Sequence, residues 1–195
     1  MEVVPKDIKT TGWRKRNIVY IIDVNLRMQK QMDHTFINDP EALIRIVEYQ
    51  PEHRARFKEI NEQWITRLYV LEEEDKKTLD DPYDYVLKNG GKIYIALYND
   101  YPVGTCAYLN LGKGEYEMIK MAVDEKYRGL KLGWRIGEHS VQKIKELGAK
   151  KIILFSNRKG SAVAIQLYHK LGFKEVPLGS SEFIRADIKM EIDYG

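Results

Sequence analysis

Residues 116–134 have the sequence YEMIKMAVDEKYRGLKLGW, the most informative pattern in this chain. Apolar residues over 116–123 predict a strand, and a short basic loop with two glycines leads from it into a predicted helix. The start of a helix has backbone N–H groups without partners and the positive end of the helix dipole. Glycine lets a phosphate approach the backbone, and Arg128 and Lys131 add positive charge. The segment therefore predicts a phosphate-binding loop.

Two common phosphate-binding motifs do not fit this loop. A Walker A loop requires Gly-Lys followed by Ser or Thr, which this loop lacks. The dinucleotide-binding fingerprint requires three glycines after a parallel strand, whereas the strand here belongs to a predicted antiparallel meander. Taken alone, the loop is also compatible with an ordinary strand–helix turn, so the surrounding sequence has to identify the ligand.

Two motifs in the expected order resemble one family. Arg128 and Gly133 match the first and last positions of Arg/Gln-x-x-Gly-x-Gly/Ala, the acyl-CoA-binding motif of the GNAT superfamily of N-acetyltransferases. Lys131 stands at the usual middle glycine of that motif. Further along, Asn157 and the segment 164–173 resemble the family's Asn…Ala-x-x-Leu-Tyr-x-x-x-Gly-Phe motif. The resemblance covers about residues 42–195.

The resemblance implies that acetyl-CoA is the acyl donor and indicates which residues bind it. In the family, backbone groups of the central strand bind the pantetheine and the thioester, and the loop holds the pyrophosphate. The implied cofactor-binding residues are Met121, Ala122, Val123, Arg128, Gly129, Leu130, Lys131, Leu132, Gly133, Trp134 and Asn157. Asn157 is also compatible with a routine turn or helix cap. No metal is expected, because histidines and the cysteine lack ligand spacing.

The resemblance also implies two residues for proton transfer. Tyr168 stands where the family has its tyrosine general acid, and a phenol with a pKa of about 10 can donate a proton to the departing thiolate. The alternative is a tyrosine that only packs its helix against the sheet. Glu117, on the central strand, is the candidate general base. Its competing interpretation is a surface or cross-strand partner for a lysine such as Lys120.

The predicted order of elements is β-α-α-β-β-β-α-β-α-β-β. It mixes hairpins with crossover helices, which predicts an α/β (α+β) fold with a mixed, mostly antiparallel sheet of about seven strands and about four helices. Strands are expected over 43–49, 92–97, 103–109, 116–123, 151–155, 173–176 and about 184–193. Helices are expected from Pro51, from the acidic run 72–75, over 132–147 and over 162–170.

Composition limits the class of protein. A length of 195 residues with 44% apolar and 31% charged residues suits a globular domain with an appendage. We expect a basic N-terminal extension over 1–41 and the acetyltransferase domain over 42–195. The net charge of +3 is too small to predict a nucleic-acid binder. One cysteine, no long apolar stretch and no signal-peptide pattern together predict a cytoplasmic protein.

The predicted function is direct transfer of an acetyl group from acetyl-CoA to a primary amine of a small molecule, peptide or protein. One alternative is a GNAT-fold module that binds acyl-CoA with little or no catalysis. Another is a nucleic-acid-binding or partner-binding protein that uses the basic segment 1–40. The acceptor stays open, although Trp64, Tyr69 and the acidic run are expected near its site and would favour a cationic amine. A homodimer is expected by resemblance only.

Overall fold

The computed structural model describes residues 43–179 and 184–195, and the predicted basic extension over 1–41 lies outside them. One seven-stranded sheet has the order β1-β2-β3-β4-β5-β7-β6. Its strands are β1 Ile44–Glu48, β2 Lys92–Tyr98, β3 Tyr101–Gly112, β4 Glu115–Val123, β5 Lys151–Ser156, β6 Lys174–Val176 and β7 Ile188–Asp193. Neighbouring strands pair antiparallel except β4 with β5, which are parallel. This confirms the predicted mixed sheet.

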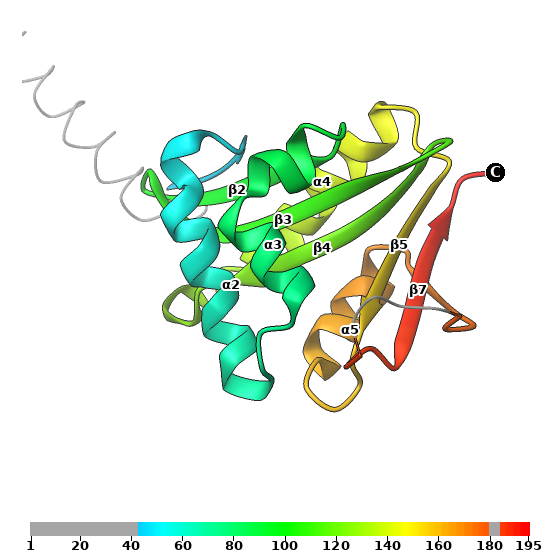
Figure 1. Ribbon diagram of the computed structural model, residues 1–195. Coiled ribbons are helices and arrows are strands. Elements are labelled where there is room, and N and C mark those ends of the chain that lie inside the picture. The colour runs from blue at the N-terminus through cyan, green and yellow to red at the C-terminus, as the bar shows by residue number, and fades with distance from the viewer. Residues whose placement is uncertain (1–42, 180–183) are drawn as a thin grey trace, which may run out of the picture. The chain divides into compact units, whose positions relative to one another are not determined.

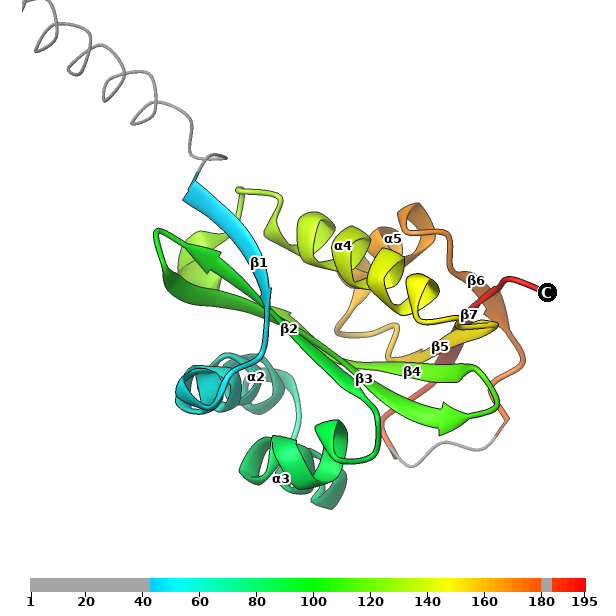
Figure 2. The same ribbon diagram turned by 90° about the horizontal axis from the view of Figure 1, so that it is seen from above.

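Within residues 43–179 and 184–195, four α-helices cover the two faces of the sheet. They are α2 Arg54–Leu68, α3 Glu73–Asp80, α4 Leu132–Glu146 and α5 Ala162–Lys170. Figure 2 shows α2 and α3 on one face and α4 and α5 on the other. A short 3-10 turn at Pro51–His53 leads into α2, and a single π turn at Tyr83–Leu87 follows α3. The part of the chain that the structure describes therefore has three layers with the sheet in the middle.

Each face of the sheet buries its own apolar cluster. Side chains alternate along a strand, so β2 sends Ile93 and Ile95 to the α2 layer and Tyr94 to the α4 layer. Phe57 of α2 packs in the first cluster and Ile136 of α4 in the second, both fully buried. Because both faces are covered, β2 is apolar along nearly its whole length.

Local capping explains where α3 begins and where α4 ends. Glu72 caps α3, and its backbone N–H donates a 3.1 Å hydrogen bond to Asp75 in a capping box. The acidic run therefore opens a helix, as predicted. Gly148 follows α4 with a φ of 87°, the left-handed conformation that glycine adopts easily at this position.

The last strand is shorter than the predicted 184–193. It begins at Ile188, and residues 184–187 form a turn and an irregular approach to it. The alternation of polar residues that predicted the strand includes residues 184–187. In the structure, side chains of these residues bond to other elements instead of facing a sheet. Asp187, for example, accepts a 2.8 Å hydrogen bond from the backbone N–H of Arg158.

The parallel strands β4 and β5 pair over only three residues each. Glu115, Tyr116 and Glu117 lie opposite Lys151, Ile152 and Ile153, and the ladder ends there. Beyond that point β5 continues to pair with β7 as far as Ser156, while β4 continues to pair with β3. Figure 1 shows β4 and β5 diverging from their paired end. The sheet is therefore split along two thirds of the length of β4, from Met118 to Val123.

Candidate active site

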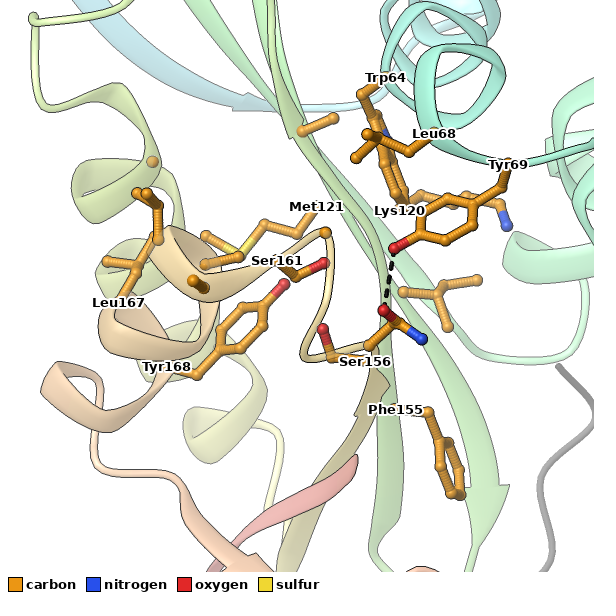
Figure 3. Close-up of a pocket in the computed structure, with 18 of the residues that line it drawn as sticks. Trp64, Leu68, Tyr69, Lys120, Met121, Phe155, Ser156, Ser161, Leu167 and Tyr168 are labelled. Carbon is orange, nitrogen blue, oxygen red and sulfur yellow. Dashed lines mark hydrogen bonds between the residues drawn. The ribbon is translucent and has the colours of Figure 1, made fainter. Parts of the chain in front are cut away.

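A cavity of about 580 Å³ lies where β4 and β5 diverge. One wall comes from the end of α2, with Trp64 and Tyr69, and the opposite wall from α5, with Leu167 and Tyr168. Figure 3 shows these two groups facing each other across Met121 of β4. Since α2 and α5 cover opposite faces of the sheet, the cavity can bring together two ligands that approach from the two faces.

β4 contains a β-bulge next to this cavity. Thr105 of β3 pairs with Ala122, whereas Ala107 pairs with Ile119, so β4 has one extra residue over this stretch. Lys120 has a φ of 50°, in the left-handed region. The Thr105 hydroxyl donates a 2.8 Å hydrogen bond to the Lys120 carbonyl oxygen. A side chain of the neighbouring strand therefore helps to hold the bulge.

The extra residue changes the direction of the side chains that follow. Ile119 packs in the cluster under α2, and Lys120, the next residue, reaches the same layer and bonds to Asp75 of α3. Met121 then packs with the cluster on the other face. In a regular strand successive side chains point to opposite faces, so Ile119 and Lys120 would not lie on the same face. The bulge thus places a buried lysine on one side of the cavity and a methionine on the other.

Asp75 is the centre of a buried ion cluster on the α3 side of the cavity. Its carboxylate is fully buried and accepts a 2.8 Å bond from the Lys120 ammonium. The Arg185 guanidinium donates two bonds of 2.8 and 2.9 Å to the same carboxylate and lies 3.0 Å from Glu72. The cluster ties α3, β4 and the segment before β7 to one another.

The attraction between the opposite charges of this cluster offsets the energetic cost of burying them. Burial alone raises the pKa of Asp75, but the Arg185 hydrogen bonds and the Lys120 charge outweigh it, so the pKa lies below its ordinary value. Burial lowers the pKa of Lys120, and Asp75 offsets part of that effect. Arg185 and Lys120 line the cavity, whereas Asp75 lies behind them. Sequence reasoning missed both lining cations, because their shared partner Asp75 is 45 residues from Lys120 and 110 residues from Arg185.

A second link joins α2 to the loop that follows β5. The Tyr69 hydroxyl lies 3.2 Å from Oδ1 of Asn157, the dashed line in Figure 3. The same oxygen accepts a 2.9 Å bond from the backbone N–H of Lys159, and Nδ2 of Asn157 donates a 2.6 Å bond to the Arg185 carbonyl. The bond to Lys159 is the turn interaction that was the alternative interpretation of Asn157.

The predicted phosphate loop is anchored at its start. Asp124 accepts a 3.0 Å bond from the backbone N–H of Lys126 and pairs with Arg56 of α2 at 2.7 Å. At the end of the loop, Lys131 stands at the N-cap position of α4 in the left-handed conformation, with a φ of 54°. A lysine there costs about 1 kcal/mol relative to glycine. Lys131 therefore adopts the backbone conformation that favours glycine.

The candidate acid and base lie on opposite sides of β4. Tyr168 of α5 packs edge-to-face against Phe173, with ring centroids 6.1 Å apart, and its hydroxyl points toward the cavity in Figure 3. Burial raises the pKa of Tyr168, so its phenol keeps its proton at neutral pH. Glu117 lines the cavity from β4 and is half-buried.

The cavity brings together most of the predicted site residues. Those that line it are Glu117, Met121, Ala122, Val123, Arg128, Gly133, Asn157 and Tyr168. Gly129, Leu130, Lys131, Leu132 and Trp134 are not among its lining residues. Leu132 is buried in the core under α4, so only its backbone can face a ligand. Arg67 lines the cavity as well and was not predicted; it pairs with Glu125, which also pairs with Arg128 at 2.8 Å.

The sequence matches a family model over the same region. The model describes the acetyltransferase (GNAT) family and matches residues 51–173, more than half of the chain. The chain belongs to the GNAT acetyltransferase family. This confirms the resemblance seen in the two sequence motifs. No curated protein sequence matches the chain significantly.

Solved GNAT structures have the same fold. An acetyltransferase of the GNAT family from Staphylococcus aureus superimposes with a TM-score of 0.70 and 22% identity, covering 78% of this chain and 99% of that one. YncA of Salmonella typhimurium, solved with its cofactor acetyl-CoA, has a TM-score of 0.63 and 15% identity, covering 78% and 95%. The PaiA N-acetyltransferase of Thermoplasma acidophilum, in complex with coenzyme A, has a TM-score of 0.60 and 17% identity, covering 77% and 99%.

The described part of this GNAT chain contains neither a candidate membrane-spanning helix nor a candidate metal cluster. Over residues 43–179 and 184–195, no helix combines the length and apolar character needed to cross a bilayer. Within the same ranges, no three His, Cys, Asp or Glu residues gather in a way that could hold a metal ion.

The ion cluster predicts a large loss of stability for Asp75→Asn. Removing the charge takes away the buried carboxylate that Lys120 and Arg185 share, and breaking a buried pair in this way costs about 3–5 kcal/mol in the free energy of unfolding. Urea denaturation at neutral pH measures the loss. Glu73→Gln, at the exposed start of the same helix, is the control and should change stability little.

The loss should also depend on pH. Because the folded-state pKa of Asp75 lies below its unfolded value, its contribution is present above the unfolded pKa and disappears as pH falls through the folded pKa. The difference between wild type and Asp75→Asn should therefore shrink in acid. A difference that stays constant down to low pH would show that Asp75 does not stabilise the fold as a carboxylate.

Proposed function

We propose that this GNAT protein is an N-acetyltransferase that moves the acetyl group of acetyl-CoA directly to a primary amine. The observation that carries the proposal is the cavity between β4 and β5, which is lined from both faces of the sheet. Such a cavity suits a reaction between two ligands better than the binding of one. The bound acetyl-CoA and coenzyme A in the two solved relatives support the choice of donor.

The donor would lie between the diverging strands. Beyond Glu117, β4 has no β5 partner, so backbone groups at Met121, Ala122 and Val123 can bond to the pantetheine and the thioester. The pyrophosphate would lie at the start of α4, where Arg128 adds positive charge. Arg128 is exposed and paired to Glu125, and an exposed ion pair is weak enough for a phosphate to replace it.

The chemistry needs an acid and a base on the two sides of the thioester. The amine nitrogen attacks the acetyl carbonyl carbon, and the carbon–sulfur bond then breaks. Tyr168 would give its proton to the departing thiolate, and its raised pKa keeps it protonated until then. Glu117, on the α2 side of β4, would take the proton from the amine directly or through a water.

The alternative to this proposal is a module that binds acyl-CoA without catalysis. The sequence argument for that alternative was the lysine at the usual middle glycine, and Lys131 takes the left-handed conformation there. Lys131 therefore keeps the backbone conformation that suits the usual glycine, which favours the proposed catalysis over this alternative. A cytoplasmic location and a homodimer remain predictions.

Tyr168→Phe should lower kcat by about 100-fold or more while the Kd for acetyl-CoA stays nearly constant, because only the acid is removed. Thiol release with the best amine from a panel measures kcat, and calorimetry measures acetyl-CoA binding. Tyr83→Phe, exposed and outside the cavity, is the control and should match wild type. Unchanged turnover in Tyr168→Phe would remove the acid assignment.

Glu117→Gln should change the pH dependence of the reaction. If Glu117 accepts the amine proton, the acidic limb of the kcat/KM profile belongs to it and should disappear in the variant, with a rate loss of about 100-fold at neutral pH. Steady-state rates across the pH range measure both effects. A profile that superimposes on that of wild type would exclude Glu117 as the base.

A further inference from the structure

Arg56 joins the first turn of α2 to the start of the predicted phosphate loop. Its side chain is 13% exposed, and Nη2 donates a 2.7 Å hydrogen bond to the Asp124 carboxylate, which is 6% exposed. Nε and Nη2 also donate bonds of 3.3 and 3.2 Å to the Pro102 carbonyl oxygen near the start of β3. The guanidinium stands 4.8 Å from the Tyr101 ring centroid and pairs with Glu59 at 2.7 Å. These contacts hold the guanidinium in one position beside Asp124.

Asp124 in turn holds the part of the loop that carries Arg128. While Oδ2 of Asp124 accepts the bond from Arg56, Oδ1 accepts a 3.0 Å bond from the backbone N–H of Lys126. That second bond caps the 3-10 turn Glu125–Tyr127. Arg128 follows this turn directly and lines the cavity. The Asp124 side chain therefore helps to set where the loop presents Arg128.

The Asp124 carboxylate depends on Arg56 to stay charged and in place. Burial raises the pKa of Asp124, but the hydrogen bonds from Arg56 and from the Lys126 backbone outweigh it, so the pKa lies below its ordinary value. Without Arg56, the carboxylate would be a buried charge without its main partner. It would then repel an anion bound by the loop, or turn to solvent and release the N–H of Lys126. Either change would weaken a phosphate site.

Arg56 and Asp124 are not among the described residues that line the cavity, so they can act on a ligand there only through the loop. We infer that Arg56 is a positioning residue of the donor site, which holds the phosphate loop for the pyrophosphate of acetyl-CoA through Asp124. This inference rests on the proposed function, which places the pyrophosphate at the start of α4. Helix α2 then serves both parts of the site, because its end lines the cavity with Trp64 and its first turn holds the loop.

Two acetyl donors test this inference. S-acetylpantetheine has the thioester and the pantetheine arm of acetyl-CoA but no pyrophosphate. We expect Arg56→Met to lower kcat/KM for acetyl-CoA by about tenfold or more, chiefly through KM, and kcat/KM for S-acetylpantetheine by less than about twofold. Thiol release with the best amine from a panel measures both. A purely structural role would lower the two values alike, and that result would overturn the inference.

Arg54→Met is the matched control. Arg54 is an exposed arginine on the same turn of α2, and it donates a hydrogen bond to the Asp80 carbonyl oxygen of α3 and not to the loop. Its variant also removes one positive charge and one link from α2 to a neighbouring element. The ratio of the two donors' kcat/KM values should therefore stay at its wild-type value in Arg54→Met.

A second substitution tests whether Arg56 acts through Asp124. Asp124→Asn keeps a side-chain oxygen for the N–H of Lys126 but removes the charge that Arg56 balances. In the double variant Arg56→Met, Asp124→Asn, the ratio of the two kcat/KM values should return to within about threefold of wild type. A double variant with the same ratio as Arg56→Met would overturn the inference.

Arg56→Lys keeps the test decisive if Arg56→Met does not fold. A lysine keeps the positive charge but lacks the planar fork that bonds Asp124 and Pro102 together. It should show the same selective loss for acetyl-CoA, by about threefold or more. Equal losses for the two donors, or no loss, in a folded Arg56→Lys protein would contradict the inference.

Binding measurements separate this inference from the proposed function. If wild type acetylates no amine, the proposed function fails, and calorimetric Kd values for the two donors still test the inference. Arg56→Met should then bind acetyl-CoA about tenfold more weakly and S-acetylpantetheine as wild type does. The inference is overturned if wild type binds acetyl-CoA no more tightly than S-acetylpantetheine, or if Arg56→Met keeps the wild-type Kd for acetyl-CoA.

Discussion

The end of the β4–β5 ladder after Glu117 and Ile153 is the constraint on which the site depends. A continuous ladder would satisfy the backbone groups of β4 and close the sheet. Where the ladder stops, those groups need another partner, because unpaired backbone N–H and C=O groups are costly when buried. A ligand that lies between the strands can supply it, and the helices on the two faces then supply the reacting groups. The bulge at Lys120 lies in the same stretch and distributes the side chains of β4 between the two faces.

A split sheet requires other links between its halves, and two of those among the described residues lie beside the cavity. Asp75 joins α3 and β4 on one half to Arg185, which precedes β7, on the other. Tyr69 at the end of α2 joins Asn157 after β5. These bonds cross the region where strand pairing is missing, so the same residues that hold the halves together also shape the cavity. The stability of the fold and the shape of the cavity are therefore coupled at Asp75.

The sequence predicted what is encoded locally. Helix α5 was predicted over 162–170, its observed range, because helical spacing and a glycine just after it are short-range signals. The acidic run was correctly predicted to open α3, but the contact of Asp75 with Lys120 was not, since 45 residues separate them. The left-handed bulge also escaped prediction, because a lysine in an apolar strand carries no signal for it. The cofactor site was predicted from the family motifs, because hydrophobic periodicity predicts helices and strands but not a ligand.

The crystal structure of the protein with acetyl-CoA is the most direct test of the central claim. We expect the pantetheine to pass between β4 and β5, with the thioester carbonyl bonded to a backbone N–H of Met121 or Ala122. The sulfur should lie within about 3.5 Å of the Tyr168 hydroxyl. A pantetheine bound outside the gap between the strands, or a sulfur far from Tyr168, would contradict the account.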